Sequence, residues 1–228
     1  MLRAVIFDFN GIIVNDEPIH FELFQRVLGE EGLHLAEEDY YARYLGMDDR
    51  GCFSAAFRDQ GQELTEARLA ELIERKANYY QQAIRDRIAL FPGVRRLLSE
   101  LADKFPLGIA SGALRHEIEL ILSTAGLRQF FSAIVSAEDV VEGKPAPEIF
   151  LKTLRELNSR ASAAPPIAPA ECLVIEDSKE GIRGAAKAGM KCLAVANSHP
   201  AEKLKEADAV VQSLDEVNPP LLNRLFSQ

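Results

Sequence analysis

Residues 5–11 read Val-Ile-Phe-Asp-Phe-Asn-Gly, an apolar run that ends in a carboxylate and is soon followed by a glycine. The first three residues are β-branched or aromatic, which is typical of a strand buried on both faces in a parallel sheet. Ligands of open α/β sheets bind beyond the carboxyl ends of the strands. The stretch therefore predicts a strand that delivers Asp8 to a functional edge, although Asp8 alone would equally fit the start of a turn before Gly11.

The composition is that of an ordinary globular protein. The chain has 228 residues, of which 47% are hydrophobic, so it can form one large core or a core with a smaller insertion. A net charge of -9 and a pI near 5.1 argue against nucleic acid or an anionic membrane as the main partner, because both bind basic surfaces. The three cysteines lack metal-ligand spacing and favour a reducing compartment. With a strand expected near the start and no apolar run of membrane-spanning length, we expect a cytoplasmic protein.

A helix is expected directly after the first strand, over about residues 16–31. Asp16 is a candidate N-cap, Pro18 is tolerated in a first turn, and Gly32 suits the end of a helix. From about residue 34 to 87, apolar residues recur at three- and four-residue steps, and no strand is apparent. After residue 87 the sequence pattern changes.

That second pattern alternates helices with short apolar runs, which predicts βαβ units and a parallel sheet covered by helices. We therefore expect a Rossmann-like α/β core formed by residues 1–15 and 88–228, with a helical domain at 16–87 inserted into it. A proline- and alanine-rich surface connection is expected at 159–169. The later strands are expected at Leu107 to Ala110, Ala133 to Val135, Leu173 to Ile175, Cys192 to Ala196 and Ala209 to Val211.

Two of these strands are followed by residues suited to binding an anion. Ser111 and Gly112 offer a hydroxyl and backbone amides before a helix, which is a natural phosphate cradle, although Ser111 could also be a simple helix cap. Lys144 lies in a turn stiffened by Pro145 and Pro147, so it could place a point charge on an anion. The alternative for Lys144 is a solvated loop lysine.

A further strand ends in the adjacent acids Glu176 and Asp177. Together with Asp8, these carboxylates would repel one another unless a cation lay between them, and Mg²⁺ prefers such oxygen ligands. A capping Asp beside a surface Glu is the alternative. A carboxylate can attack phosphorus only if the phosphoryl charge is neutralised, so acids, a lysine and amides at neighbouring strand ends fit phosphoryl transfer.

Four motifs carry a resemblance to a known family over nearly the whole chain: residues 8–11, 111–112, 143–150 and 176–178. In this order, at strand ends, they resemble the haloacid dehalogenase superfamily. The similarity is to its phosphatase and β-phosphoglucomutase-like branch, which has a helical cap inserted after the first strand. The resemblance implies that residues 16–87 form a mobile cap that closes over the substrate and expels water.

By this resemblance, Asp8 is the nucleophile that takes the phosphoryl group as an aspartyl-phosphate, which water then hydrolyses. Mg²⁺ would be held by Asp8, the backbone carbonyl of Asn10 and Asp177, with Glu176 nearby as an outer or direct ligand. The residues implied to bind the transferring phosphoryl group are Ser111, Gly112 and Lys144.

The helical segment carries weaker matches to the same branch. His20, Arg50 and Lys76 look like cap residues that face the leaving group. Two of them have a plainer alternative. His20 lies on an apolar helix face and could simply pack, and Lys76 could reach solvent from its long stem.

Asn10 is the clearest departure from the family pattern. Phosphate-transferring members usually have an aspartate two residues after the nucleophile, which protonates the leaving oxygen and later activates water. Asn10 can donate a hydrogen bond but has no ionisable proton. Its backbone carbonyl is unaffected, so the implied metal site should survive.

The leading hypothesis is a magnesium-dependent phosphatase that acts on a small phosphorylated metabolite. Asn10 would make this enzyme slow. A monomer is compatible with the sequence. A phosphomutase would use the same strand ends and stays open as an alternative, as does a phosphate-binding protein without catalysis. Dehalogenation is disfavoured, because it needs neither Lys144 beside a phosphate site nor magnesium at Glu176 and Asp177. Phosphonate hydrolysis also resembles this fold, but it requires a small residue at position 10 and a cap lysine that forms a Schiff base, and only Lys76 favours it.

Overall fold

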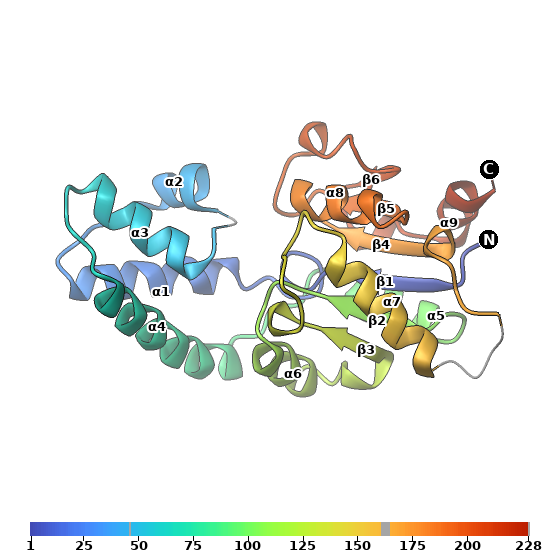
Figure 1. Cartoon of the computed structure of the whole chain (residues 1–228), viewed down its shortest axis with the longest axis horizontal. Helices are drawn as coiled ribbons and strands as arrows, with labels where there is room; N and C mark the ends of the chain where they lie inside the picture. Colours follow the sequence, from blue (N-terminus) through green and yellow to red (C-terminus); the bar gives the residue numbers. More distant parts are fainter. Residues whose placement is uncertain (46, 161–164, 228) are drawn as a thin grey trace. The chain divides into compact units, whose positions relative to one another are not determined.

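The computed structural model describes residues 1–45, 47–160 and 165–227. The chain divides into two compact units, Met1–Asn15 with Ile88–Gln228, and Asp16–Arg87 (Figure 1). The first unit holds all six strands of the described residues, and the described part of the second is helical and irregular. Each unit has its own apolar core.

The sheet is parallel throughout, with the strand order β3-β2-β1-β4-β5-β6. This arrangement confirms the predicted α/β fold, with the first strand in the interior of the sheet. The strands are β1 Ala4–Phe7, β2 Leu107–Ala110, β3 Phe131–Val135, β4 Cys172–Glu176, β5 Lys191–Val195 and β6 Ala209–Val211.

Four strands differ from the sequence prediction at one or both ends. β1 starts at Ala4, one residue before the expected start, and β4 spans Cys172–Glu176, one residue longer than expected at each end. β3 starts at Phe131, two residues before the expected start, and β5 begins at Lys191 and ends at Val195, one residue earlier than expected at each end. The β5 ladder begins where Lys191 pairs in register with Leu173. A charged side chain can occupy the first position of a ladder, so the apolar run alone did not locate the end of the strand.

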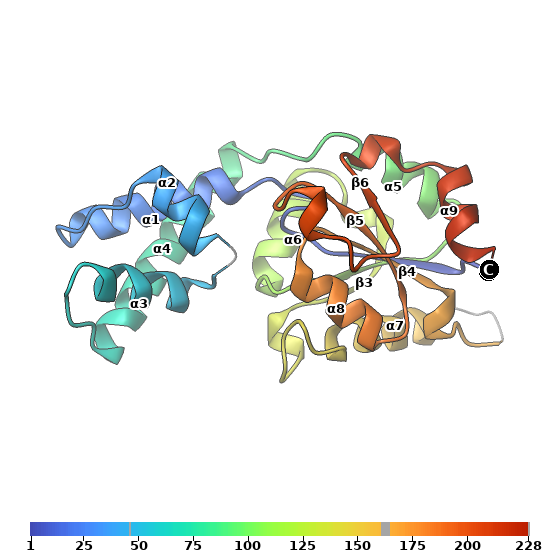
Figure 2. The same cartoon turned by 90° about the horizontal axis from the view of Figure 1, so that it is seen from above.

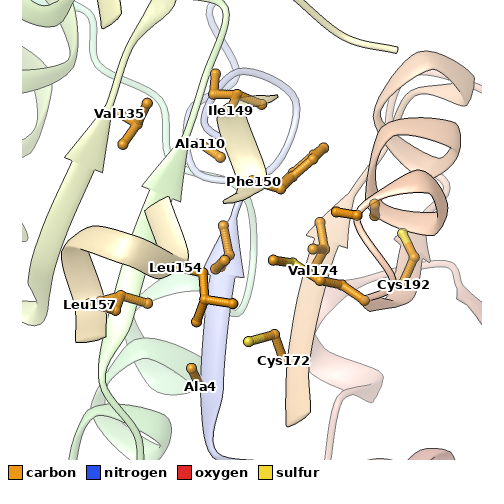
Figure 3. Packing of buried hydrophobic residues seen from close by; sticks show 14 of the residues in the cluster. Ala4, Ala110, Val135, Ile149, Phe150, Leu154, Leu157, Cys172, Val174 and Cys192 are labelled. Carbon is orange, nitrogen blue, oxygen red and sulfur yellow. The ribbon is translucent and has the colours of Figure 1, made fainter. Parts of the chain in front are cut away.

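Helices cover both faces of the sheet. Figure 2 shows α7 and α8 on one face, and α5 and α9 on the other. The helices of this unit are α5 Val94–Ala102, α6 Arg115–Thr124, α7 Glu148–Arg160, α8 Lys179–Lys187 and α9 Pro219–Phe226. The cluster between the sheet and α7 includes Ile6, Val174, Phe150 and Leu154, all at most 5% exposed (Figure 3). Burial on both faces explains the uninterrupted apolar runs of the central strands.

The expected surface connection at 159–169 is shorter than predicted. Ser159 and Arg160 belong to the last turn of α7, where a basic residue interacts favourably with the helix dipole. Residues 161–164 lie outside the described residues. Pro165 and Pro166 accept hydrogen bonds from the guanidinium of Arg3 through their carbonyls.

The second unit is built from two long helices and shorter pieces. These are α1 Glu17–Glu30, α2 Glu37–Asp39, the π-helix η1 Tyr40–Tyr44, α3 Asp49–Asp59 and α4 Glu66–Asp86. Buried residues of α1, α3 and α4, among them Phe24, Phe53 and Leu72, form a shared cluster. None of the helices in the described ranges is both long and apolar enough to cross a membrane.

The prediction that Asp16 caps α1 with its side chain is wrong. Asp16 stands at the N-cap position but makes no side-chain cap hydrogen bond. Its carboxylate instead accepts a hydrogen bond from Tyr80 Oη at 2.6 Å and lies 3.2 Å from His20 Nε2. A tertiary contact with α4 therefore replaces the local cap.

Candidate active site

Asp8 follows β1 directly and is held by the neighbouring strand. Its backbone N–H donates to the carbonyl of Ile175 at 2.9 Å, which continues the β1–β4 ladder by one residue. The chain then turns sharply, with the N–H groups of Ile13 and Val14 donating to the carbonyl of Phe9. Asp8 is buried, with only 8% of the residue exposed. The prediction that the first strand delivers an acid to the carboxyl edge of the sheet is therefore matched by the local geometry.

Glu176 and Asp177 stand at the end of the adjacent strand β4. Because Phe7 is level with Ile175, Asp8 lies beside Glu176 in the sheet. One oxygen from each of the three carboxylates lies within 4.8 Å of the others, and all three side chains are buried. Among the described residues this is the group that could hold a metal ion. Its all-oxygen donor set fits a hard divalent cation.

Lys144 brings a positive charge to this group. Its Nζ donates to Asp8 Oδ1 and to Glu176 Oε1, both at 2.5 Å. The alternative of a solvated loop lysine is therefore wrong, since two strand ends hold this side chain at 13% exposure. Three carboxylates and one ammonium leave an excess of two negative charges, which is the charge that one Mg²⁺ would balance.

Glu176 is fixed on both of its oxygens. While Oε1 accepts from Lys144, Oε2 accepts from the backbone N–H groups of Asp177 and Ser178 and from the Ser178 hydroxyl. Ser178, not Asp177, caps α8 by accepting from Gly181 N. A Cβ on Gly181 would lie 1.8 Å from Glu176 Oε1, so this glycine makes room for the carboxylate. The alternative of a capping Asp beside a surface Glu is therefore wrong.

Burial and mutual repulsion shift the protonation of these acids. Burial raises the pKa of Asp8 to about 7, an effect that Lys144 opposes and Glu176 increases. Burial, together with the nearby charges of Glu176 and Asp8, also raises the pKa of Asp177 well above its ordinary value of 3.8. For Lys144, burial alone would lower the pKa, but the two adjacent carboxylates raise it above its usual value. Without a further cation, the site therefore favours protonated acids.

Ser111 is not a helix cap, because α6 begins four residues later with Leu114 at its N-cap position. The Ser111 hydroxyl instead accepts a hydrogen bond from Ala113 N at 3.0 Å, and the side chain is fully buried beyond the end of β2. The space beside Gly112 is open, since a Cβ there would meet nothing within 4 Å. Both residues follow the strand that lies next to β1 on the side opposite β4.

Two residues that the sequence prediction missed lie after β5 and contact Asp177 and the turn that follows Asp8. Asn197 Nδ2 donates to the carbonyl of Gly11 at 2.7 Å, and the Ser198 hydroxyl donates to Asp177 Oδ2. Asn10, the residue next to Gly11, is half-buried, and its backbone bridges to Val14. A polar pair directly after an apolar strand was the sequence signal that could have indicated Asn197 and Ser198.

The helical unit contains a separate cluster of polar side chains. Lys76 is 1% exposed, and its Nζ lies 2.5 Å from Asp49 Oδ1 and 2.9 Å from His20 Nδ1. His20 also stacks on Tyr80, with ring centroids 4.7 Å apart. The alternative that Lys76 reaches solvent is therefore wrong, because Asp49 and His20 hold its ammonium group.

Arg50 has a different environment within the same unit. It is exposed, and its guanidinium donates to Glu66 Oε2 at 2.7 Å. This pairing links the start of α3 to the start of α4. The structure of this unit thus joins His20 and Lys76 through a short contact and leaves Arg50 on a surface ion pair.

Comparison with known proteins gives the family. The model of haloacid dehalogenase-like hydrolases matches residues 5–195. The chain therefore belongs to this family of enzymes, as the four motifs predicted.

Named relatives include phosphatases and a phosphomutase. The 5-amino-6-(5-phospho-D-ribitylamino)uracil phosphatase of Arabidopsis thaliana is 30% identical over 219 residues, which cover 94% of this chain and 55% of that protein. This chain thus spans about half the length of the plant enzyme. The β-phosphoglucomutase of Bacillus subtilis is 29% identical, with 100% of this chain and 96% of that protein covered. The crystal structure of β-phosphoglucomutase from Clostridium difficile superposes with a TM-score of 0.81 at 24% identity, covering 100% and 98% of the two chains, which shows the same fold.

The electrostatics of the acidic group predict how stability depends on pH in metal-free protein. Folded Asp8, with a pKa of about 7, and Asp177 keep protons that the unfolded chain releases near pH 4. The free energy of unfolding should therefore lose a contribution as the pH rises from about 4 to 7. Asp177→Asn removes one of the repelling charges. With a chelator present, the melting temperature of Asp177→Asn should match that of the wild type near pH 4 and exceed it at pH 8. The increase should be about 2–4 °C for each kcal/mol of repulsion that the substitution removes.

The control is Asp103→Asn, at the exposed end of α5, which should follow the wild type at every pH. A melting temperature of Asp177→Asn at or below that of the wild type at pH 8 would show that the three acids do not repel one another as described.

Proposed function

We propose that the protein is a magnesium-dependent phosphatase that acts on a small phosphorylated metabolite through an aspartyl-phosphate on Asp8. The observation that carries this proposal is the buried group of Asp8, Lys144, Glu176 and Asp177 at the carboxyl edge of a parallel sheet. Such a group offers a nucleophilic carboxylate together with charges of both signs that can bind a phosphoryl group and a cation. The named phosphatases among its relatives support the same reaction class.

Mg²⁺ would be held by the carboxylates of Asp8 and Asp177 and by the backbone carbonyl of Asn10, with Glu176 beside them. When bound, this ion neutralises negative charge on the phosphoryl oxygens and so lowers the barrier to attack by an anion. Ser111, the open space at Gly112, and Lys144 would receive the phosphoryl group itself.

In the first step, a carboxylate oxygen of Asp8 forms a bond to phosphorus as the bond from phosphorus to the ester oxygen breaks. The electron pair of that bond leaves with the ester oxygen, which takes a proton from solvent water, because Asn10 has none to give, and departs as an alcohol. In the second step, water attacks the phosphorus of the aspartyl-phosphate, releases inorganic phosphate and restores the carboxylate of Asp8. Lys144 keeps the Asp8 side chain oriented and offsets negative charge in both steps.

A phosphomutase is the second candidate, because β-phosphoglucomutase of Bacillus subtilis is similar over the whole length of this chain. It would differ only in the second step, in which a phosphorylated sugar rather than water would accept the phosphoryl group from Asp8. The arrangement of Asp8, Lys144 and the two adjacent acids serves both reactions equally.

For the helical unit we propose the role of a cap that covers the site during turnover. His20, Lys76 and Arg50 would then face the leaving group. The contacts of Lys76 with His20 and with Asp49 support a preorganised polar cluster, because each of these side chains is already oriented by a neighbour.

A panel of phosphate esters tests the proposed function. Sugar phosphates, phosphoglycolate, nucleotides and p-nitrophenyl phosphate are incubated with and without Mg²⁺, and inorganic phosphate is measured. We expect Mg²⁺-dependent release from at least one ester, and loss of that release in Asp8→Asn, which removes the attacking carboxylate. Conversion of one sugar phosphate isomer into another without phosphate release would support the mutase. Binding without any turnover would overturn the enzyme proposal.

Asn10→Asp tests the departure from the family pattern. A positioned general acid-base contributes typically ~10²–10⁴-fold to a rate, so the variant should be faster wherever the leaving oxygen needs a proton. The gain should be large for sugar phosphates, whose alkoxide leaving groups are poor, and small for p-nitrophenyl phosphate. Rates are compared at saturating Mg²⁺. Equal rates for the two proteins on every ester would show that residue 10 is not the acid-base position.

A further inference from the structure

The loop after β5 contacts the acidic group through Ser198 and the turn that follows Asp8 through Asn197. Ser198 donates its hydroxyl to Asp177 Oδ2, and Asn197 donates its amide to the carbonyl of Gly11 at 2.7 Å. Both residues are half-buried. They follow a strand that is separated from β1 by β4, so three strand ends are joined through these contacts.

We infer that Ser198 and Asn197 are positioning residues that set the affinity of this site for Mg²⁺, by orienting the Asp177 carboxylate and the backbone of residues 10–11. This inference rests on the proposed function. It goes beyond it by assigning a role to the end of β5, outside the four motifs of the family resemblance.

Ser198 acts on an acid that would otherwise tend to turn away. Asp177 is 5% exposed and lies next to two like-charged side chains, so repulsion opposes the conformation that brings its oxygen near theirs. A hydrogen bond from a neutral hydroxyl holds the carboxylate without adding a competing positive charge. The carboxylate keeps acceptor capacity for a cation, because its two oxygens offer about four lone-pair sites.

Gly11 also limits the position of the Asp177 carboxylate, at the same oxygen that Ser198 contacts. A Cβ on Gly11 would lie 1.9 Å from Asp177 Oδ2, so the carboxylate rests directly against the Gly11 backbone. Gly11 itself has a φ of 78°, in the left-handed region that favours glycine. The Asp177 side chain is thus held by Ser198 and by the turn that follows the nucleophile.

Asn197 acts on the same turn. Gly11 donates its N–H to the carbonyl of Val14 at 3.0 Å and accepts from Asn197 at its carbonyl, so both sides of this residue are fixed. The carbonyl of Asn10 belongs to the same planar peptide unit as the N–H of Gly11. Fixing Gly11 therefore fixes the direction of the Asn10 carbonyl, the proposed backbone ligand.

The loop can transmit this orientation because its own backbone is anchored. Ala196 donates its N–H to the carbonyl of Val211 at 2.9 Å, and Asn197 donates to the carbonyl of Val195 at 2.9 Å. In register, Ala194 of β5 is level with Glu176 of β4. Such supporting hydrogen bonds to metal ligands are typically worth 10–100-fold in metal affinity or activity.

The test measures Mg²⁺ binding to the resting protein by calorimetry and by the rise in melting temperature with added Mg²⁺. Ser198→Ala should raise the Mg²⁺ dissociation constant by about 10–100-fold. Ser198→Thr keeps the hydroxyl and should restore affinity close to that of the wild type. Asn197→Asp, which places a second acceptor against the Gly11 carbonyl, should also weaken binding. Ser159→Ala, which deletes a hydroxyl on the exposed surface of α7, is the matched control and should have no effect.

Kinetics provide the second measurement. In Ser198→Ala, the Mg²⁺ concentration for half-maximal rate should rise, while kcat at saturating Mg²⁺ stays near that of the wild type. Wild-type Mg²⁺ affinity in Ser198→Ala and Asn197→Asp would overturn the inference and leave the proposed phosphatase intact. A wild-type protein that neither binds Mg²⁺ nor depends on it would overturn both. A loss of binding in Ser159→Ala as large as in Ser198→Ala would also overturn the inference, because the effect would then not be specific to the site.

Discussion

The pair of 2.5 Å contacts from Lys144 Nζ to Asp8 and Glu176 is the interaction on which the site depends. It joins a loop after β3 to the ends of the two central strands, which are adjacent only because the sheet places β1 beside β4. Without the ammonium, three buried carboxylates would face one another unpaired, at a cost that burial makes severe. With it, the group still carries more negative than positive charge.

That remaining imbalance connects stability with function. In the metal-free protein, repulsion among these buried acids costs stability. Under the proposed function, a bound divalent cation would relieve that repulsion and release the protons that the acids hold. The packing also makes room for the acids. Gly11 leaves the space that the carboxylate of Asp177 occupies, and Gly181 does the same for Glu176. The backbone around the site is therefore shaped by the acids rather than by the apolar core.

Much of the fold and the core of the site could be predicted from the sequence. The apolar runs before Asp8, Ser111 and Glu176 indicated buried strands, and parallel strands place their carboxyl ends at one edge, so these residues were expected to come together. The pairing of Lys144 with two carboxylates was not predictable in detail, because a loop lysine reads the same in sequence whether it is solvated or buried. The four motifs that indicated the family also contain the candidate site residues, because both the motifs and the site lie at or after the ends of the strands.

Other contacts were beyond the reach of local patterns. The hydrogen bond of Ser198 to Asp177, and those of Tyr80 and Lys76 within the helical unit, join residues far apart in the chain, and nothing in the spacing of either partner indicates the other. Asp16 illustrates the consequence, since a residue with strong capping preference is used instead for a tertiary contact. Local sequence preferences thus indicated where a helix begins, whereas the hydrogen-bond partner of its first side chain depended on a residue far away in the chain.

The central claim is that the carboxylate of Asp8 takes the phosphoryl group. The most direct measurement is mass spectrometry of the intact protein, followed by peptide mapping, after turnover of p-nitrophenyl phosphate with Mg²⁺ is stopped by acid. Our account predicts that a fraction of the chains gains the mass of one HPO₃ group, located on Asp8, and that this gain disappears in Asp8→Asn. Steady turnover with the label on another residue, or undiminished turnover in Asp8→Asn, would contradict it.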